Sequence, residues 1–160
     1  MLRQLIIQTP IMPMVLISDG QQLVRSDFLY DEQSYLQYED IKLETDAILT
    51  MAKEQLAEYF AGTRTKFKLP MLLTGTDFQH DVWAQLKAIP YGQTISYQQL
   101  AQIILRPKAA RAVGGACRAN PLLVIVPCHR VLATSGAYTG YAGDKIFVKE
   151  HLLRLEGGIR

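Results

Sequence analysis

Short apolar runs separated by turn-like pieces mark the first 45 residues. The runs LII, MVLI and FLY alternate with pieces such as SDGQ and DEQS. This spacing indicates two to four short strands in one antiparallel sheet. Residues 46–60, DAILTMAKEQLAEYF, instead repeat their apolar positions at the helical period. Asp46 suits the N-cap of this predicted helix and Gly62 suits its end. The stretch 61–75, with Pro70 and Gly75, is interpreted as a linker.

Helix-start signals dominate the second half of the chain. The pieces T-x-x-Q at residues 76–79 and S-x-x-Q at residues 96–99 have the form of capping boxes. The first precedes FQHDVWAQLKAI, a predicted helix that ends at Pro90. The second predicts a short helix that starts at Tyr97 and runs to about Ile104.

A second short helix follows at once. Arg106-Pro107 ends one helix and begins the next, because proline suits the first helical position. Two short helices joined by a tight turn are typical of a helix-turn-helix. The sequence therefore predicts this motif, with a first helix from Tyr97 to about Ile104 and a second helix that begins at Pro107.

The second of these helices, PKAARAVGGACRAN, has two faces. One is apolar, and the other is a cationic stripe with a glycine in its middle. Such a stripe suits a recognition helix, because cations meet phosphate and glycine admits close backbone approach. Two adjacent glycines cost about 1 kcal/mol each inside a helix, so a packing or contact reason is expected. A solvated face with a close helix–helix contact is the alternative. The apolar face holds Ala109, Val113, Ala116 and Cys117, and the stripe holds Lys108, Arg111, Gly115 and Arg118.

Charge divides the chain in the same place. The net charge is +2, but residues 1–76 hold 7 Lys/Arg and 10 Asp/Glu, while residues 77–160 hold 10 and 5. An acidic front and a basic back indicate two functional units, the basic one facing a polyanion, although ordinary solvated faces would also explain the imbalance.

No apolar run approaches the ~20 residues of a membrane span, and the N-terminus lacks a signal-peptide cleavage site. Two cysteines are too few for a disulfide scaffold and indicate a reducing compartment.

The stretch VIVPCHRV, residues 124–131, carries the candidate chemistry. Its apolar run predicts a strand that ends at Pro127. A reactive thiol needs a base or a positive environment, and His129 and Arg130 are the candidates. A structural anchoring role is the further expectation for Arg130. Neighbouring residues of a strand point to opposite sides, so contact between Cys128 and His129 requires a turn after Pro127 or a bridging water. The alternative is that Cys128 is a small buried hydrophobe, as we interpret Cys117.

The last helix, DKIFVKEHLLRLEGG, contains a carboxylate in an unfavourable place. Asp144 is its predicted cap and Gly157 its end, so Glu156 faces the negative end of the helix dipole, at a cost of about 0.3–1 kcal/mol. A glutamate tied to a histidine would have a reason to lie there. Cysteine, histidine and glutamate together would form a nucleophile, a base and an orienting group.

These stretches together resemble the O6-alkylguanine-DNA alkyltransferase family, also called methylated-DNA–protein-cysteine methyltransferases. The matching pieces cover essentially all of residues 77–160 in the family's order and spacing. They are FQHDVWAQLKAIPYGQTISYQQLA, ARAVGGACRANP, VPCHRV, SGAYTGYAGD and KEHLLRLEG. Upstream, QLAEYFAGTRTKFKLP resembles the family's domain connection, and residues 1–45 match only in character.

The resemblance implies an α+β fold of two domains. Residues 1–76 would form a ribonuclease H-like mixed domain with the connecting segment. Residues 77–160 would form a helix-turn-helix, winged-helix-like domain with the active site. It would bind duplex DNA through the minor groove and flip O6-alkylguanine, with O4-alkylthymine as a second expected substrate, into a pocket. The thiol would become a thioether, so each molecule would react once.

Individual roles follow from the same resemblance. The implied catalytic residues are Cys128 as alkyl acceptor, His129 as water-linked base, Glu156 as its orienting carboxylate, Asn120 as a hinge and Tyr97 as a contact to the flipped nucleotide. The implied DNA-binding residues are Arg111, which fills the gap in the base stack, Tyr97, Lys108, Gly115 and Arg118. Tyr141, Val131, Ala142 and Cys128 would line the substrate pocket.

Several absences complete these expectations. No cofactor is implied, and no metal is predicted, because residues 1–76 lack the Cys and His with which some members bind zinc. Ala142 and Leu123 stand where some members have Ser and Pro. The expected protein is monomeric, bound to no membrane, and cytoplasmic, or nuclear in a eukaryote.

Three rival functions remain at this point. A lesion sensor that flips bases is disfavoured by the intact Cys128. A cysteine hydrolase would not need a helix-turn-helix. A plain helix-turn-helix regulator leaves Glu156 unexplained.

Overall fold

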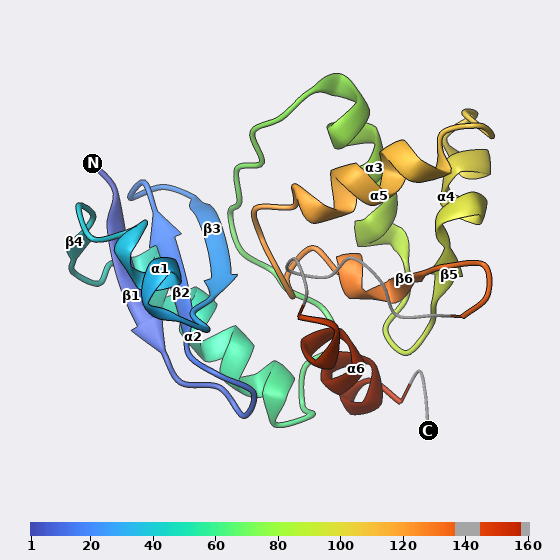
Figure 1. Cartoon of the computed structure of the whole chain (residues 1–160). Coiled ribbons are helices and arrows are strands. Elements are labelled where there is room, and N and C mark those ends of the chain that lie inside the picture. Colours follow the sequence, from blue (N-terminus) through green and yellow to red (C-terminus); the bar gives the residue numbers. More distant parts are fainter. Residues whose placement is uncertain (137–144, 158–160) are drawn as a thin grey trace. The chain divides into compact units, whose positions relative to one another are not determined.

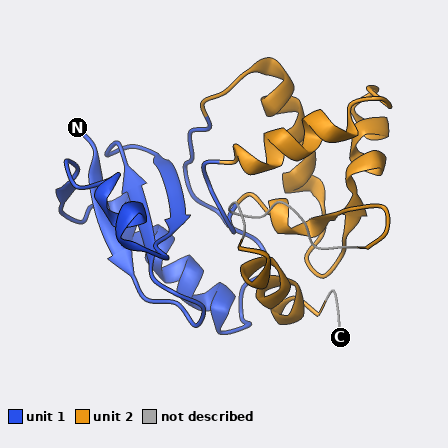
Figure 2. Cartoon of the chain, viewed as in Figure 1, with its two compact units in different colours: residues 1–73, 121–125 blue, residues 74–120, 126–160 orange. Residues whose placement is uncertain are grey.

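The computed structural model describes residues 1–136 and 145–157 and divides the chain into two compact units (Figure 2). Unit 1 is Met1–Leu73 with Pro121–Ile125, and unit 2 is Thr74–Asn120 with Val126–Arg160. The boundary near residue 73 lies close to the predicted one. Residues 121–125 also belong to unit 1, which the predicted division at residues 76 and 77 does not include. The two predicted domains therefore stay a prediction.

Unit 1 is built on a four-stranded sheet with the order β3-β2-β1-β4 (Figure 1). The pairs β1–β2 and β2–β3 are antiparallel, as predicted, but β4 runs parallel to β1. The expected single antiparallel sheet is therefore wrong at this edge, because the chain crosses over before β4 and returns beside β1 in the same direction. The strands are β1 (Arg3–Ile7), β2 (Met14–Ser18), β3 (Leu23–Phe28) and β4 (Lys42–Leu43).

The crossover contains a helix that the sequence pattern did not predict. Helix α1 (Glu32–Leu36) occupies the piece interpreted as a turn. Asp31 accepts a hydrogen bond from the Ser34 amide at 2.8 Å, and Ser34 Oγ accepts one from the Asp31 amide at 3.1 Å. This is a capping box with serine in place of the usual Glu or Gln, which explains why the pattern was missed.

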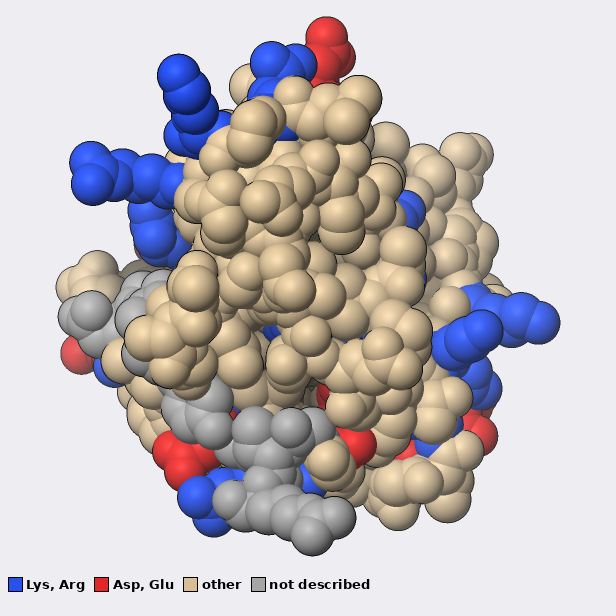
Figure 3. All heavy atoms as spheres, turned by 90° about the vertical axis from the view of Figure 1, so that its right-hand side faces the viewer, with Lys and Arg blue, Asp and Glu red and all other residues tan. Residues whose placement is uncertain are grey.

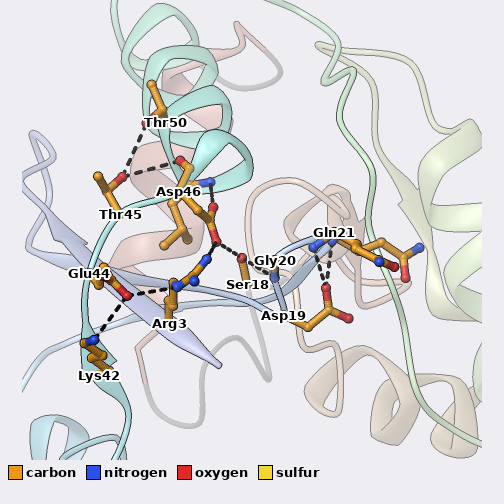
Figure 4. A network of polar contacts seen from close by, with 12 residues as sticks. Arg3, Ser18, Asp19, Gly20, Gln21, Lys42, Glu44, Thr45, Asp46 and Thr50 are labelled. Atoms are coloured by element: carbon orange, nitrogen blue, oxygen red, sulfur yellow. Dashed lines mark hydrogen bonds and ion pairs between the residues drawn. The ribbon is translucent and has the colours of Figure 1, made fainter. Parts of the chain in front are cut away.

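Helix α2 (Ala47–Phe60) confirms the predicted helix of unit 1. Its apolar face is buried, and Gly62 closes it in the left-handed conformation at φ 82°. Asp46 caps its start through the Leu49 amide and also accepts from Ser18 Oγ (Figure 4). Arg3, in β1, is 3.7 Å from the same carboxylate. These bonds fix the start of α2 against the sheet.

The apolar run that ends before Pro127 does not form the predicted strand, and it is preceded by and overlaps the segment Pro121–Ile125 of unit 1. This segment bridges β3 at Ser26, whose amide donates to the Pro121 carbonyl at 3.0 Å and whose carbonyl accepts from the Leu123 amide at 3.1 Å. It then turns, with Val124 at φ 74°. A buried apolar run does not by itself distinguish a strand from a buried turn, and here burial on all sides explains the composition.

Unit 2 is mostly helical. Both predicted capping boxes are present: Thr76 starts α3 (Asp77–Ala88) and Ser96 starts α4 (Tyr97–Ile103). Helix α5 (Ala110–Arg118) packs against both, and the Trp83 indole of α3 donates to the Ala116 carbonyl at 2.9 Å. Two short strands, β5 (Ile95–Ser96) and β6 (Val131–Leu132), pair in parallel, and α6 (Ile146–Leu155) follows.

The start of the predicted recognition helix needs correction. Pro107 is not its first residue, since α5 begins at Ala110. Instead Arg106 and Ala109 close a turn, the Ala109 amide donating to the Arg106 carbonyl at 2.9 Å, with proline at its favoured second position. Lys108 therefore lies in the turn before α5 and not on the helix.

The last helix agrees with prediction at its end but not at its start. Gly157 stops α6 at φ 74°. Lys145 is the N-cap residue, with no side-chain cap bond, and the predicted cap Asp144 lies outside the described residues. No helix in the described ranges is long and apolar enough to span a bilayer.

Candidate active site and nucleic-acid interface

The β5–β6 pair brings the two chemical segments of unit 2 together. Ile95 pairs with Val131 and Ser96 with Leu132. Ser96 caps α4, so Tyr97 begins that helix next to the pair, while Cys128, His129 and Arg130 directly precede the partner strand. Residues about thirty positions apart in the sequence are thus held side by side.

The candidate nucleophile lies on a tight turn. The Cys128 amide donates to the Val126 carbonyl at 2.8 Å across Pro127, whose φ and ψ of −83° and 66° are those of an inverse γ-turn. Cys128–Arg130 then form one turn of 3₁₀-helix. The sequence analysis required a turn here if neighbouring side chains were to cooperate, and the structure has one.

A single buried carboxylate holds the two residues after Cys128. His129 Nε2 donates to Glu156 Oε2 at 2.7 Å, and Arg130 Nε donates to Glu156 Oε1 at 2.8 Å. Arg130 Nη2 makes a further bond to Oε2 at 3.1 Å, and Nη1 donates to the Ile89 carbonyl at 2.7 Å. All three side chains are buried. The expected contact between His129 and Glu156 is present, and Arg130, expected to act as a structural anchor, binds the same carboxylate.

Burial raises the pKa of the Cys128 thiol to about 11. A hydrogen bond with the Asn120 side chain and the positive charge of Lys149 act in the opposite direction and lower this pKa. Asn120 also donates to the Val126 carbonyl at 2.7 Å. The Asn120 side chain therefore links the two ends of the segment 121–125 and also contacts the Cys128 thiol. At neutral pH the thiol is therefore protonated, and it could act as a nucleophile only if a base removed its proton.

His129 is suited to that task. Burial lowers its pKa, while the Glu156 carboxylate acts in the opposite direction, so the ring is neutral near pH 7. The Nε2 hydrogen is directed to Glu156 because a carboxylate can only accept. This assigns the lone pair, and hence the basic site, to Nδ1.

Lys149 is a site residue that the sequence analysis missed. Its Nζ donates to the Tyr97 hydroxyl oxygen at 3.3 Å and lies 5.5 Å from the ring centroid. The side chain is buried, and burial lowers its pKa. A signal existed in the sequence, because Lys149, Leu152 and Glu156 share one face of α6. A lysine on the face that also carries the buried leucine is out of place unless it has a partner.

The two predicted faces of α5 separate as expected. Val113, Ala116 and Cys117 are buried, whereas Arg111 and Arg118 are exposed. Lys108 is exposed too, in the preceding turn. Burial raises the pKa of the Cys117 thiol well above the ordinary range, and the interpretation that Cys117 has no chemical role stays a prediction.

The glycines of α5 are not explained by packing. A Cβ added to Gly114 would meet nothing closer than 3.8 Å, and one added to Gly115 nothing closer than 3.9 Å. Both distances are ordinary van der Waals contacts. A close helix–helix contact therefore does not explain this pair of glycines, and the predicted contact of Gly115 with a partner stays a prediction beside the alternative of a solvated face.

The described residues complete only part of the predicted pocket. Val131 is buried at the start of β6. Tyr141 and Ala142 lie outside the described residues. In residues 1–136 and 145–157, no group of three His, Cys, Asp or Glu side chains is arranged to hold a metal ion.

Comparison with known proteins decides the family. The DNA-binding domain of 6-O-methylguanine DNA methyltransferases matches residues 77–158, and the ribonuclease-like domain of the same family matches residues 2–73. The chain belongs to this family. The family and the mixed α+β fold expected from the sequence are thereby confirmed.

Relatives of known name support the assignment to the 6-O-methylguanine DNA methyltransferase family. A methylated-DNA–protein-cysteine methyltransferase of Methanosarcina acetivorans is 41% identical over 152 residues, which cover 95% of this chain and 96% of the relative. One from Mycobacterium tuberculosis is 45% identical over 150 residues, covering 94% and 89%. A crystal structure of M. tuberculosis OGT in complex with DNA has a TM-score of 0.86 at 42% identity, covering 98% of this chain and 92% of that one.

Proposed function

We propose that this protein repairs alkylated DNA by moving the alkyl group from O6-alkylguanine to Cys128. The observation that carries the proposal is the buried Cys128 thiol in a unit that matches the family's DNA-binding domain, with His129 held by Glu156 next to it. The names of its relatives supply the reaction class.

The proposed reaction needs one proton removed and one supplied. His129 takes the proton of the Cys128 thiol, directly or through a water, while sulfur attacks the alkyl carbon. The carbon–O6 bond breaks as the sulfur–carbon bond forms, and the electron pair leaves on guanine. Tyr97 donates a proton toward the guanine ring, and its oxygen accepts a hydrogen bond from the Lys149 ammonium group. The product thioether is stable, so each molecule reacts once.

The raised pKa of Cys128 fits this division of roles. A thiol that is protonated at rest is protected from unspecific alkylation. It becomes a nucleophile only when a base is aligned with an incoming substrate. The neutral His129 provides that base near pH 7.

The proposed DNA contact uses the exposed face of α5. Arg111, Arg118 and the preceding Lys108 would meet phosphates or the groove, and bare backbone at Gly115 would let the duplex approach. A base inside a duplex is out of reach of a buried thiol, so the damaged nucleotide must be flipped out. Arg111 would fill the gap that it leaves. We extend the proposal to O4-alkylthymine as a second substrate and to a monomeric protein.

Peptide mass spectrometry tests the proposal directly. Incubation with a duplex containing O6-methylguanine should add one methyl group to the Cys128 peptide and none to the Cys117 peptide, which is the internal control. A second portion of substrate should transfer nothing more. An unmodified Cys128 peptide, or repair that survives Cys128→Ala, would reject the proposal.

A further inference from the structure

An exposed leucine adopts a backbone conformation that favours glycine. Leu105 has φ 62° and is 87% exposed. It directly follows the C-cap of α4: its amide donates to the Gln102 carbonyl at 3.0 Å, and the Arg106 amide donates to the Ala101 carbonyl at 2.9 Å. These two bonds form a Schellman motif, in which the left-handed position is usually glycine.

The same chain uses glycine at comparable helix ends. Gly62 after α2 and Gly157 after α6 have φ of 82° and 74°, with open space where a Cβ would lie. Leucine at this position strains the backbone, and its exposed side chain gains no burial in return. Residues that break a local rule without a structural benefit are candidates for function.

The surroundings of Leu105 indicate what it contacts. Ile103, at the end of α4, is 52% exposed, and the exposed cations Arg106, Lys108 and Arg111 follow. The sequence contains no Asp or Glu from residue 82 to residue 143. In Figure 3, which turns the α4 side of Figure 1 toward the viewer, Lys and Arg atoms gather along the upper left edge beside a broad area without charge.

We propose that Ile103 and Leu105, here called the apolar turn, contact deoxyribose groups of bound duplex DNA. The apolar turn would lie against sugars while the neighbouring cations meet the flanking phosphates. This inference rests on the proposed function only for the identity of the polyanion as DNA. It assigns to the α4–α5 connection a sequence-independent contact outside the lesion pocket.

Charge favours DNA over a second copy of this chain as the occupant. A symmetric contact places the same patch on both partners. Two copies joined at the apolar turn would bring their Arg106, Lys108 and Arg111 side chains together, and residues 82–143 supply no Asp or Glu to pair with them. A sugar-phosphate backbone alternates an apolar group with an anion and complements both features.

Fluorescence anisotropy with a lesion-free duplex tests the proposal on the full chain. Leu105→Gly and Leu105→Ala should each weaken binding about three- to tenfold. Neither should change the salt dependence, because no cation is removed, whereas Lys108→Ala should flatten it. Leu43→Ala is the matched control, an exposed leucine of β4 in unit 1 (69% exposed), and should bind as the wild type does. Leu105→Gly should melt at or above the wild-type temperature, because glycine suits φ 62°.

Two results would overturn the proposal. Wild-type affinity in both Leu105 variants would show that the Leu105 side chain does not contribute to duplex binding. A loss of affinity that accompanies a change from dimer to monomer in sedimentation would reassign the apolar turn to a contact between copies. Methyl transfer by the wild type is measured separately. If the wild type transfers nothing while the Leu105 variants still lose duplex affinity, the proposed function fails and the apolar turn stands.

Discussion

Replacement of Glu156 by glutamine should destabilise unit 2 far more than the same change elsewhere on α6. The carboxylate is 1% exposed and accepts from His129 at 2.7 Å and from Arg130 at 2.8 and 3.1 Å. Glu156→Gln keeps the shape but removes the charge, and it turns one oxygen into an NH₂ group that faces donors. Arg130, itself buried, is then left without its anion.

The expected magnitude follows from the burial of both partners. Breaking a buried ion pair by removing one partner costs about 3–5 kcal/mol. For a chain of this length, about 2–4 °C of melting temperature corresponds to each kcal/mol, so a decrease of about 6–20 °C is expected. The matched control is Glu150→Gln on the same helix. Glu150 accepts from Arg154 at 2.6 Å on the surface, and such exposed pairs contribute at most about 0.5 kcal/mol.

Urea unfolding of the wild type and both variants measures the difference. A double-mutant cycle with Arg130→Met sharpens it, because removing both partners leaves no uncompensated charge. The double variant should therefore be less destabilised than the sum of the single variants. If Glu156→Gln falls within about 1 kcal/mol of Glu150→Gln, or if the cycle is additive, the carboxylate does not anchor the site as argued.

Three further predictions concern the thiol and the DNA face. The Cys128 pKa is about 11 in the folded protein and 9.0 in the unfolded reference, so above pH 9 the unfolded state loses its proton first and stability falls. Between pH 8 and 10 the unfolding free energy should drop by about 1 kcal/mol more in the wild type than in Cys128→Ser; equal pH profiles in urea titrations would contradict this. Lys149→Met should slow iodoacetamide labelling of Cys128 at pH 8, followed by mass spectrometry, because the lysine charge lowers the thiol pKa; a faster or unchanged rate argues against that effect. Gly115→Ala should raise stability by up to about 1 kcal/mol yet weaken duplex binding, and a stabilised variant with full affinity would remove the glycine from the DNA face.

Local sequence signals predicted the helices of this protein well. The starts of α2, α3 and α4 depend on a cap whose partner lies three residues away, so the determining energy is contained in a short stretch. Where the local code was less usual, prediction failed: α1 uses Asp31 with Ser34, and Pro107 serves a turn before α5. Both patterns are compatible with more than one structure until the neighbouring elements are placed.

Features that depend on tertiary packing could not be predicted in the same way. The parallel pairing of β4 with β1 and the left-handed Val124 are set by the return of distant segments. The resemblance to a family indicated Cys128 and Glu156, and an anchoring role was expected for Arg130, but the partner of Arg130 required the structure. Nothing local in the sequence specifies that its guanidinium reaches a carboxylate 26 positions away.

The 3₁₀ turn determines how the side chains of the consecutive residues Cys128, His129 and Arg130 are directed. In an extended strand, His129 and Arg130 would point to opposite sides, and one carboxylate could not hold both. A 3₁₀-helix separates successive side chains by about a third of a turn. Glu156 can then bind the two later residues while Cys128 faces Asn120. Because the two residues that follow Cys128 are fixed by one buried anion, the turn that carries the thiol has little freedom to move. The unfavourable interaction of the Glu156 carboxylate with the C-terminal end of the α6 dipole is thus offset by its hydrogen bonds with His129 and Arg130.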